Sequence, residues 1–102
     1  MSLLGGLRGG AGSGRAPVPV TLYTRRGCHL CEEMKAEIAR AGCADLHELR
    51  EVDIDEDPAL ALRFGRSIPV LEIAGRAAFK GRLTAPEFRR KLERALRERA
   101  RG

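Results

Sequence analysis

Two kinds of hydrophobic spacing follow one another in the first half of the chain, beginning at Val18. Residues 18–23 read Val-Pro-Val-Thr-Leu-Tyr, a β-branched and aromatic run that predicts a strand. A proline near the beginning of a strand is tolerated because its missing N–H need not join the ladder. After a turn at residues 24–27, apolar residues recur at the spacing of one helix face: Leu30, Met34, Ile38 and Ala41. Gly42 is a stop signal for that helix.

The middle of the chain predicts a second strand and a short helix. Residues 47–54 contain Leu49, Val52 and Ile54 and predict the strand. Residues 55–58 read Asp-Glu-Asp-Pro, which predicts the beginning of a helix. Acidic side chains favour the positive end of the helix dipole, and proline suits the first turn. The helix itself is expected over residues 59–64, with Gly65 closing it.

The last third of the chain predicts a hairpin and a longer helix. Residues 69–74 form the expected third strand. A tight turn at residues 75–76 leads into a fourth, antiparallel strand at residues 77–80. Thr84 and Glu87 have the spacing of a capping box. The helix that follows has an apolar face made of Phe88, Leu92, Ala95 and Leu96.

The predicted element order, β-α-β-α-β-β-α, indicates an α/β fold with a mixed four-stranded sheet flanked by helices. We expect the first two β-α units to form right-handed parallel crossovers and the final hairpin to add an antiparallel edge. The 102 residues suffice for one domain and not for two. With 43% hydrophobic and 32% charged residues, the composition is that of a globular chain. We place the domain at residues 18–100.

Residues 1–17 differ in composition from the rest of the chain. They contain six glycines, two arginines and no acid, which predicts a disordered Gly-rich leader, although they also bear a weak likeness to an organelle transit peptide. A secretory signal would need an apolar run of about 7–15 residues, and none is present. No run approaches the roughly 20 apolar residues that span a bilayer. We therefore expect a cytoplasmic protein with no membrane contact, and three cysteines, an odd number, suit a reducing compartment.

The net charge of +5 is concentrated at the end of the chain. Residues 89–102 contain seven basic and two acidic residues, so the remaining 88 residues are neutral overall. The charge therefore predicts a solvated helix face rather than a basic patch across the domain. No aromatic residues alternate with these arginines, so stacking on single-stranded nucleic acid is not predicted.

A pair of cysteines lies where the first predicted strand gives way to the first predicted helix. Cys28 and Cys31 enclose His29 and Leu30 in a Cys-x-x-Cys pattern. A helix N-terminus has unpaired N–H groups and about half a positive charge, which favours a thiolate over a thiol. Cys28 is therefore the expected nucleophile. Cys31, nearly one turn later, is the expected resolving thiol, which releases a reduced substrate from a mixed disulfide on Cys28.

Three neighbouring residues are candidates for stabilising the thiolate and contacting a substrate. Arg25 and Arg26 lie just upstream of Cys28, before Gly27, and can add positive potential. His29 lies between the cysteines. In its protonated form it would lower the pKa of the Cys28 thiol further and make the pair a stronger oxidant.

Over residues 18–98 the sequence resembles the glutaredoxin-like branch of the thioredoxin superfamily. The resemblance rests on the strand-turn-Cys-x-x-Cys-helix pattern, on the element order, and on Ser67-Ile68-Pro69, which is similar to the family's Thr-Val-Pro signature. Residues 52–58 are also similar to those of small glutaredoxin-like proteins with a Cys-His-Leu-Cys site.

The resemblance implies a thioredoxin-like fold and a monomeric thiol-disulfide oxidoreductase that acts on protein or glutathione mixed disulfides. It implies that Pro69 is cis and faces the active-site disulfide, and that the backbone of Ile68 pairs with an extended substrate. Arg25 stands where the family has a basic residue that helps to hold glutathione, the expected reductant. No bound cofactor or metal is implied.

Two stretches depart from the family pattern. Glutaredoxins usually read Cys-Pro-Tyr-Cys at the site that reads Cys-His-Leu-Cys here. Their Gly-Gly-x-x-Asp stretch, which anchors the amino end of glutathione, corresponds to Gly81-Arg82-Leu83-Thr84-Ala85 in this chain. The second glycine and the acid are missing, so the anchor for glutathione is incomplete.

Zinc binding is the alternative interpretation of the cysteines. The chain contains Cys-x2-Cys-x11-Cys-x3-His, which could supply four tetrahedral ligands: Cys28, Cys31, Cys43 and His47. Such a site would make the chain a small interaction or nucleic-acid-binding module. A set of strands and helices that needs no metal argues against it. A third possibility is a thioredoxin fold that serves as an interaction domain, with cysteines no more reactive than free cysteine.

Overall fold

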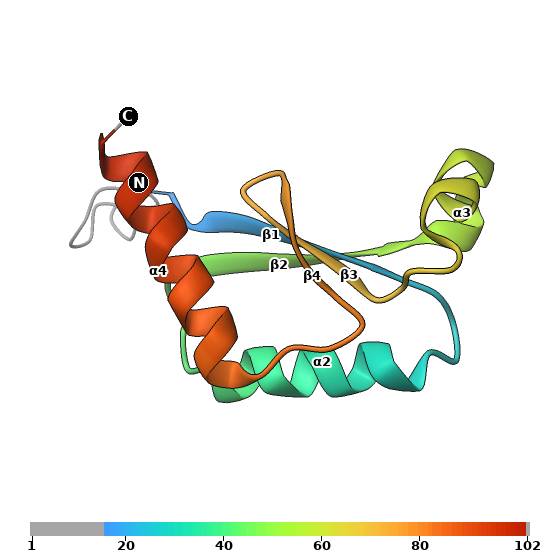
Figure 1. Ribbon diagram of the computed structural model, residues 1–102, viewed down its shortest axis with the longest axis horizontal. Coiled ribbons are helices and arrows are strands. Elements are labelled where there is room, and N and C mark those ends of the chain that lie inside the picture. The colour runs from blue at the N-terminus through green and yellow to red at the C-terminus, as the bar shows by residue number, and fades with distance from the viewer. Residues whose placement is uncertain (1–15, 102) are drawn as a thin grey trace, which may run out of the picture.

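The computed structural model describes residues 16–101, and its elements follow the predicted order, with one additional short 3-10 helix. In chain order they are β1 (Val18–Thr24), α2 (His29–Arg40), β2 (His47–Asp53), the 3-10 helix η1 (Ile54–Glu56), α3 (Pro58–Phe64), β3 (Val70–Ile73), β4 (Arg76–Lys80) and α4 (Ala85–Arg101). Figure 1 shows α3 beyond one end of the strands, α4 at the opposite end, and α2 running along the strands below the sheet. The predicted leader, residues 1–17, lies outside the described residues except for its last two.

The four strands form one mixed sheet in the order β2-β1-β3-β4. β1 and β2 are parallel, with Val18 opposite His47 and Thr24 opposite Asp53. β3 is antiparallel to β1, and β4 is antiparallel to β3, with a register shift between Leu71 and Glu72. The predicted α/β architecture is confirmed, and β2 and β4 are the two edge strands of the sheet.

The prediction that the second β-α unit forms a parallel crossover is wrong, because β3 runs antiparallel to β1. A parallel return would need a helix that carries the chain back along the whole sheet. α3 has seven residues, about 10 Å of helix. It stands beyond the ends of β1 and β2, so the chain re-enters the sheet from that same end (Figure 1).

The turn between β2 and α3 also differs from the sequence prediction. The second strand ends at Asp53, one residue early, because Ile54 begins η1 and the Asp53 side chain accepts a hydrogen bond from the Asp55 N–H at 2.9 Å. The Asp57 carboxylate accepts a hydrogen bond from the Ala59 N–H at 2.9 Å and so caps α3. Two acidic caps thus replace the single helix start expected at residues 55–58.

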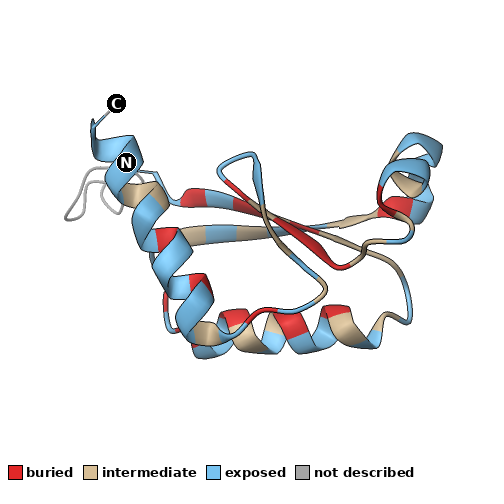
Figure 2. Ribbon diagram, viewed as in Figure 1, coloured by how far each residue is buried: buried red, intermediate tan, exposed pale blue. Residues whose placement is uncertain are grey.

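Two apolar clusters lie on opposite faces of the sheet. The larger joins one face of β1 and β3 to the inner sides of α2 and α4, and includes Leu22, Met34, Leu71, Phe88 and Leu92. The smaller lies under α3 and consists of Ile54, Phe64 and Val70, with Tyr23, Leu60 and Ile68 packed against it. Successive strand residues point to opposite faces, which is why neighbours such as Leu22 and Tyr23 belong to different clusters. Figure 2 shows the buried positions on the strands and on the inner sides of the helices.

The capping box predicted for the last helix is present. The Glu87 side chain accepts from the Thr84 N–H at 3.0 Å, and the Thr84 hydroxyl accepts from the Glu87 N–H at 3.3 Å. Phe88 and Leu92 are fully buried, and Ala95 and Leu96 pack against the same cluster. The opposite side of α4 is exposed (Figure 2). No helix within residues 16–101 is both long and apolar enough to cross a membrane.

Candidate redox site

Cys28 and Cys31 form a disulfide at the N-terminus of α2. Cys28 is the N-cap residue, with extended backbone angles of φ −83° and ψ 105°, and Cys31 lies in the first turn. The Cα atoms are 5.2 Å apart, within the range that a disulfide requires. The predicted pair is thus brought together by the first turn of α2 itself, without help from distant parts of the chain.

The two sulfurs have different surroundings. The Cys28 sulfur accepts a hydrogen bond from the Cys31 N–H at 3.1 Å, so it occupies the place of a capping oxygen. In the reduced protein this N–H and the positive end of the helix dipole would favour a Cys28 thiolate. Cys28 is partly exposed, whereas Cys31 is completely buried. An incoming group can therefore reach Cys28 and not Cys31.

Arg25 connects the loop before Cys28 to the turn after β2. Its Nε and Nη2 donate to the two carboxylate oxygens of Asp55 at 3.1 and 2.8 Å, and its Nη1 donates to the Gly65 carbonyl at 3.4 Å. The hydrogen bond from Arg25 lowers the pKa of Asp55, and the same contact raises the pKa of Arg25. Much of the positive charge expected to act on the thiolate is thus shared with Asp55.

The other two candidate cations are more exposed. His29 is 84% exposed, and its Nε2 lies 2.9 Å from a carboxylate oxygen of Glu33, one helical turn later. The other oxygen of Glu33 is 3.9 Å from Arg82 in the loop after β4. Arg26 is exposed at the turn that precedes Cys28.

The segment Ile68-Pro69 lies at the same end of the sheet as the cysteines. Val70, which follows it, pairs with Tyr23 near the end of β1, and Cys28 comes five residues after Tyr23. The Ile68-Pro69 peptide bond is cis. Pro69 is buried and its carbonyl accepts from the Gly81 N–H at 2.8 Å. Ile68 is half-buried, and within residues 16–101 its backbone N–H and carbonyl make no backbone hydrogen bond.

The alternative zinc set is not brought together. Cys28 and Cys31 lie at the beginning of α2, whereas Cys43 and His47 come after its end. The helix has 12 residues, about 18 Å, and separates the two pairs. Cys43 is buried with its thiol donating to the Ala41 carbonyl, and His47 Nδ1 is 2.9 Å from the Cys43 carbonyl. No three potential metal ligands converge in the part of the chain that the structure describes. The separation of the two pairs therefore contradicts the alternative interpretation, a four-ligand zinc site.

Comparison with known proteins identifies the family. A model of the glutaredoxin-like domain (DUF836) matches residues 19–93. The chain belongs to this family. No curated protein matches the sequence. The match covers the cysteine pair and all of the sheet except Val18, so the resemblance seen in the sequence is confirmed over residues 19–93.

Solved structures agree with this assignment. Protein XcR50 of X. campestris is 35% identical to this glutaredoxin-like domain, covering 72% of this chain and 95% of its own, with a TM-score of 0.62. Protein Ne2328 of Nitrosomonas europaea is 28% identical, covering 76% and 93%, with a TM-score of 0.62. A thioredoxin of Halobacterium salinarum, at 21% identity, covers 74% and 72% with a TM-score of 0.54 and shows the shared fold alone. The chain is thus a thioredoxin-fold domain with the adjacent cysteines of a thiol-redox protein.

Two residues of this glutaredoxin-like domain escaped the sequence reasoning. Glu33 was detectable, because it follows His29 by four residues and side chains at that spacing meet on a helix. Asp55, the partner of Arg25, lies 30 residues away in the sequence, and no local pattern connects the two.

Proposed function

We propose that this glutaredoxin-like domain is a thiol-disulfide oxidoreductase that uses the Cys28 and Cys31 couple. The observation that carries the proposal is the contrast between the two sulfurs. The Cys28 sulfur is reachable and accepts the Cys31 N–H at 3.1 Å, whereas Cys31 is fully buried next to it. This arrangement suits one attacking and one resolving thiol.

The reaction begins with the reduced pair. The Cys28 thiolate attacks one sulfur of a substrate disulfide, forming a bond between Cys28 and that sulfur. The bond between the two substrate sulfurs breaks, and the second sulfur leaves as a thiolate that takes up a proton. The Cys31 N–H, which donates to the Cys28 sulfur in the disulfide, is placed to donate to the attacking thiolate as well.

Cys31 completes the reaction. Its thiol loses a proton and attacks the Cys28 sulfur, which forms the internal disulfide and expels the remaining substrate sulfur as a thiolate. The substrate disulfide is reduced to two thiols, and the pair Cys28 and Cys31 is oxidised to the disulfide present in the structure. Two thiols of an external reductant return the pair to its reduced form. Glutathione is the expected reductant.

Substrate binding is proposed for the rim around Cys28. The unpaired backbone of Ile68, beside Pro69, offers one donor and one acceptor to an extended segment that carries the substrate disulfide. Arg26 and His29 flank Cys28 in the sequence and are exposed, so both are proposed to meet acidic groups of a substrate. Arg25 keeps a role in positioning, since its guanidinium already holds Asp55. The substrates proposed are protein disulfides and glutathione mixed disulfides, met by a monomer in the reducing cytoplasm.

The test is the intact mass of the protein after equilibration across a series of glutathione redox buffers. We expect a loss of two hydrogens at one defined potential, on a scale of roughly −120 to −270 mV for such couples. The variant Cys43→Ser should behave identically, because Cys43 is buried away from the pair. A protein that stays reduced throughout, or whose thiols react no faster than free cysteine, would leave an interaction domain as the better account.

A further inference from the structure

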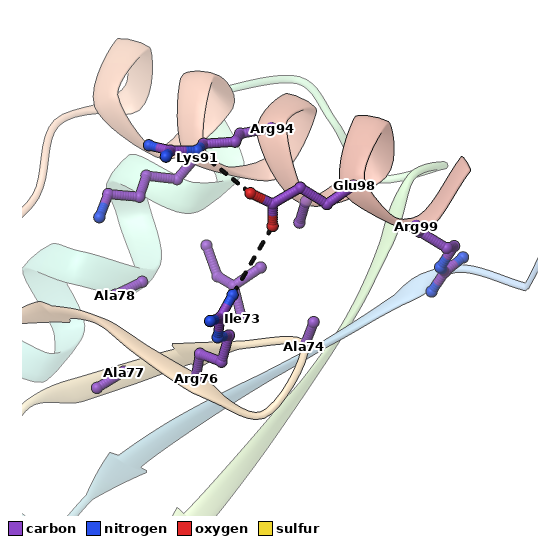
Figure 3. Close-up of a pocket in the computed structure, with 10 residues that line it drawn as sticks. Ile73, Ala74, Arg76, Ala77, Ala78, Lys91, Arg94, Glu98 and Arg99 are labelled. Carbon is purple, nitrogen blue, oxygen red and sulfur yellow. Dashed lines mark ion pairs between the residues drawn. The ribbon is translucent and has the colours of Figure 1, made fainter. Parts of the chain in front are cut away.

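A groove between α4 and the edge strand β4 lies far from the cysteines. α4 packs mainly against α2, β1 and β3, so it leaves β4 partly uncovered. The groove has a volume of about 520 Å³ and lies below α4 in Figure 3. Ile73 on its floor pairs with Val20 near the beginning of β1, whereas Cys28 follows the end of that strand. The groove and the disulfide are therefore at opposite ends of the sheet.

Basic side chains line the groove from both walls. Arg76 comes from β4, and Lys91, Arg94 and Arg99 come from α4 (Figure 3). Arg76 is 81% exposed and Arg94 is 70% exposed, so both guanidinium groups are open to solvent. Glu98 is the acidic residue among them. The excess of positive charge attracts an anionic group to this groove.

Glu98 shows how the groove holds a carboxylate. One oxygen of Glu98 lies 3.8 Å from Arg76 Nη1, and the other lies 3.5 Å from Arg94 Nε. The arginines of the two walls thus converge on a single carboxylate group (Figure 3). Both contacts are long and exposed to solvent, and such ion pairs are weak. A carboxylate from another molecule can therefore compete with Glu98 for the same two arginines.

The positive surface continues along the outer side of α4. Four arginines at positions i, i+4, i+7 and i+11 share one face of the helix: Arg90, Arg94, Arg97 and Arg101. Within residues 16–101, Arg94 alone among these four makes an ion pair with an acidic side chain. The positive charge of these four arginines attracts an acidic ligand toward this side of α4, and such attraction favours fast association.

The floor of the groove favours a protein segment over a nucleic acid. It is formed by small aliphatic side chains, which include Ala74, Ala77, Ala78 and Ala95. Single-stranded nucleic acids gain much of their affinity for proteins when their bases stack on aromatic rings. The residues that line this groove include no aromatic ring. The nearby ring of Phe79 is covered by the Lys91 ammonium at 5.5 Å. β4 is also an edge strand, and an extended peptide can pair with such an edge.

We propose that this groove binds an extended acidic segment of a partner protein, with carboxylates contacting Arg76, Lys91 and Arg94. The stretch of α4 from Lys91 to Arg99 spans about 12 Å, the length of about four extended residues. The acidic stretch of this chain at residues 53–57 is committed to its own turn, where it caps η1 and α3 and binds Arg25, so a second copy is not the occupant. Docking at this end of the sheet leaves Cys28 free to react.

The probe is a fluorescent hexaglutamate peptide, titrated with the full chain and followed by anisotropy at low salt. We expect binding that Arg76→Gln with Arg94→Gln weakens at least fivefold. The matched control is Arg50→Gln with Arg66→Gln, which removes two exposed arginines outside the groove and should bind nearly like the parent. Glu98→Gln should bind at least twofold more tightly, because the competing internal carboxylate is removed. Replacing both Cys28 and Cys31 by serine should leave binding unchanged, which separates this proposal from the redox proposal.

Several outcomes would overturn the proposal. If the control that includes Arg50→Gln lost as much affinity for hexaglutamate as Arg76→Gln with Arg94→Gln, the peptide would be bound by net charge alone. Weaker binding by Glu98→Gln would mean that Glu98 serves to hold the groove together. Tighter binding of hexauridylate than of hexaglutamate would point to a nucleic acid, and concentration-dependent self-association by light scattering would point to a second copy.

Discussion

At the scale of single residues, the position of each sulfur on the helix decides its chemistry. Cys28 is outside the first turn of α2, where its sulfur takes the Cys31 N–H that would otherwise lack a partner. Cys31, three residues later, points into the protein and is fully buried. Burial disfavours a charged thiolate, whereas a hydrogen bond and a helix dipole favour it. The same short motif therefore places two sulfurs in different surroundings, which is the basis of the separate roles proposed for them.

This asymmetry predicts different outcomes for two serine variants. Cys28→Ser should abolish reduction of hydroxyethyl disulfide, because the remaining thiol is buried. Cys31→Ser should still attack and should accumulate a mixed disulfide, visible as a stable adduct in the intact mass. Cys43→Ser is the matched control and should retain the parent rate. Reduction that persists without Cys28 would contradict the assignment of roles.

The contact between Arg25 and Asp55 predicts a pH-dependent contribution to stability. Arg25 lowers the pKa of Asp55 in the folded protein, so the contribution is present above the unfolded value of about 3.9. It is lost as the pH falls through the lowered, folded value. Asp55→Asn should therefore cause a small decrease in the urea midpoint at pH 7 and a smaller decrease at pH 2. The control is Asp45→Asn, at another exposed position, which should change the urea midpoint at neither pH. An equal effect of Asp55→Asn at both pH values would contradict the contribution assigned to the ion pair of Arg25 and Asp55.

At the scale of elements, each helix is defined by a local start signal and placed by its apolar side. Asp57 caps α3, and Thr84 with Glu87 caps α4. The apolar side of α4, with Phe88 and Leu92, then determines which face of the sheet the helix covers. Capping determines where a helix begins, and hydrophobic burial determines where it packs.

The capping box of α4 can be tested with a pair of variants. Thr84→Ala removes the hydroxyl that accepts the Glu87 N–H and should lower the free energy of unfolding by about 1 kcal/mol. Thr84→Ser keeps the hydroxyl and should restore most of this stability. Urea denaturation measures the free energy of unfolding of both variants. An equal loss of stability in Thr84→Ala and Thr84→Ser would show that the methyl group of Thr84, and not its hydroxyl, is responsible.

At the scale of the whole molecule, the sheet separates two apolar clusters, and the two proposed sites lie at its opposite ends. The larger cluster joins the sheet to α2 and α4, and the smaller lies under α3 near the cysteines. Tyr23 and Phe64 stack at 4.3 Å in the smaller cluster, which supports the end of the sheet where the loop to Cys28 begins. The groove along α4 lies at the other end.

This separation predicts that global stability and redox potential can be changed independently. Leu92→Ala empties part of the larger cluster and should lower the free energy of unfolding by about 2–5 kcal/mol. The midpoint of the redox titration should stay unchanged, because the first turn of α2 keeps its local contacts. Leu62→Ala, at an 89% exposed position on α3, is the control and should cost less than about 0.5 kcal/mol. A shifted redox midpoint in Leu92→Ala would show that the two ends are coupled.

The sequence by itself determined the features that depend on neighbours within about four residues. Helix and strand periodicity placed the main elements, and the spacing of Thr84 and Glu87 predicted a cap that is present. The disulfide belongs to this class, since Cys28 and Cys31 are joined by one turn of helix. Such features follow from backbone geometry, which is the same wherever the segment lies in the protein.

Tertiary structure alone decided the features that join distant segments. The antiparallel direction of β3 depends on where α3 stands relative to the sheet, and the pairing of Arg25 with Asp55 spans 30 residues. The separation of Cys43 from the cysteine pair, which rules out the four-ligand zinc site, follows from the straight course of α2. The groove between α4 and β4 exists because α4 buries its apolar side on β1 and β3. Hydrophobic burial chooses among many arrangements of the same elements, and no local spacing in the sequence records which one it chooses.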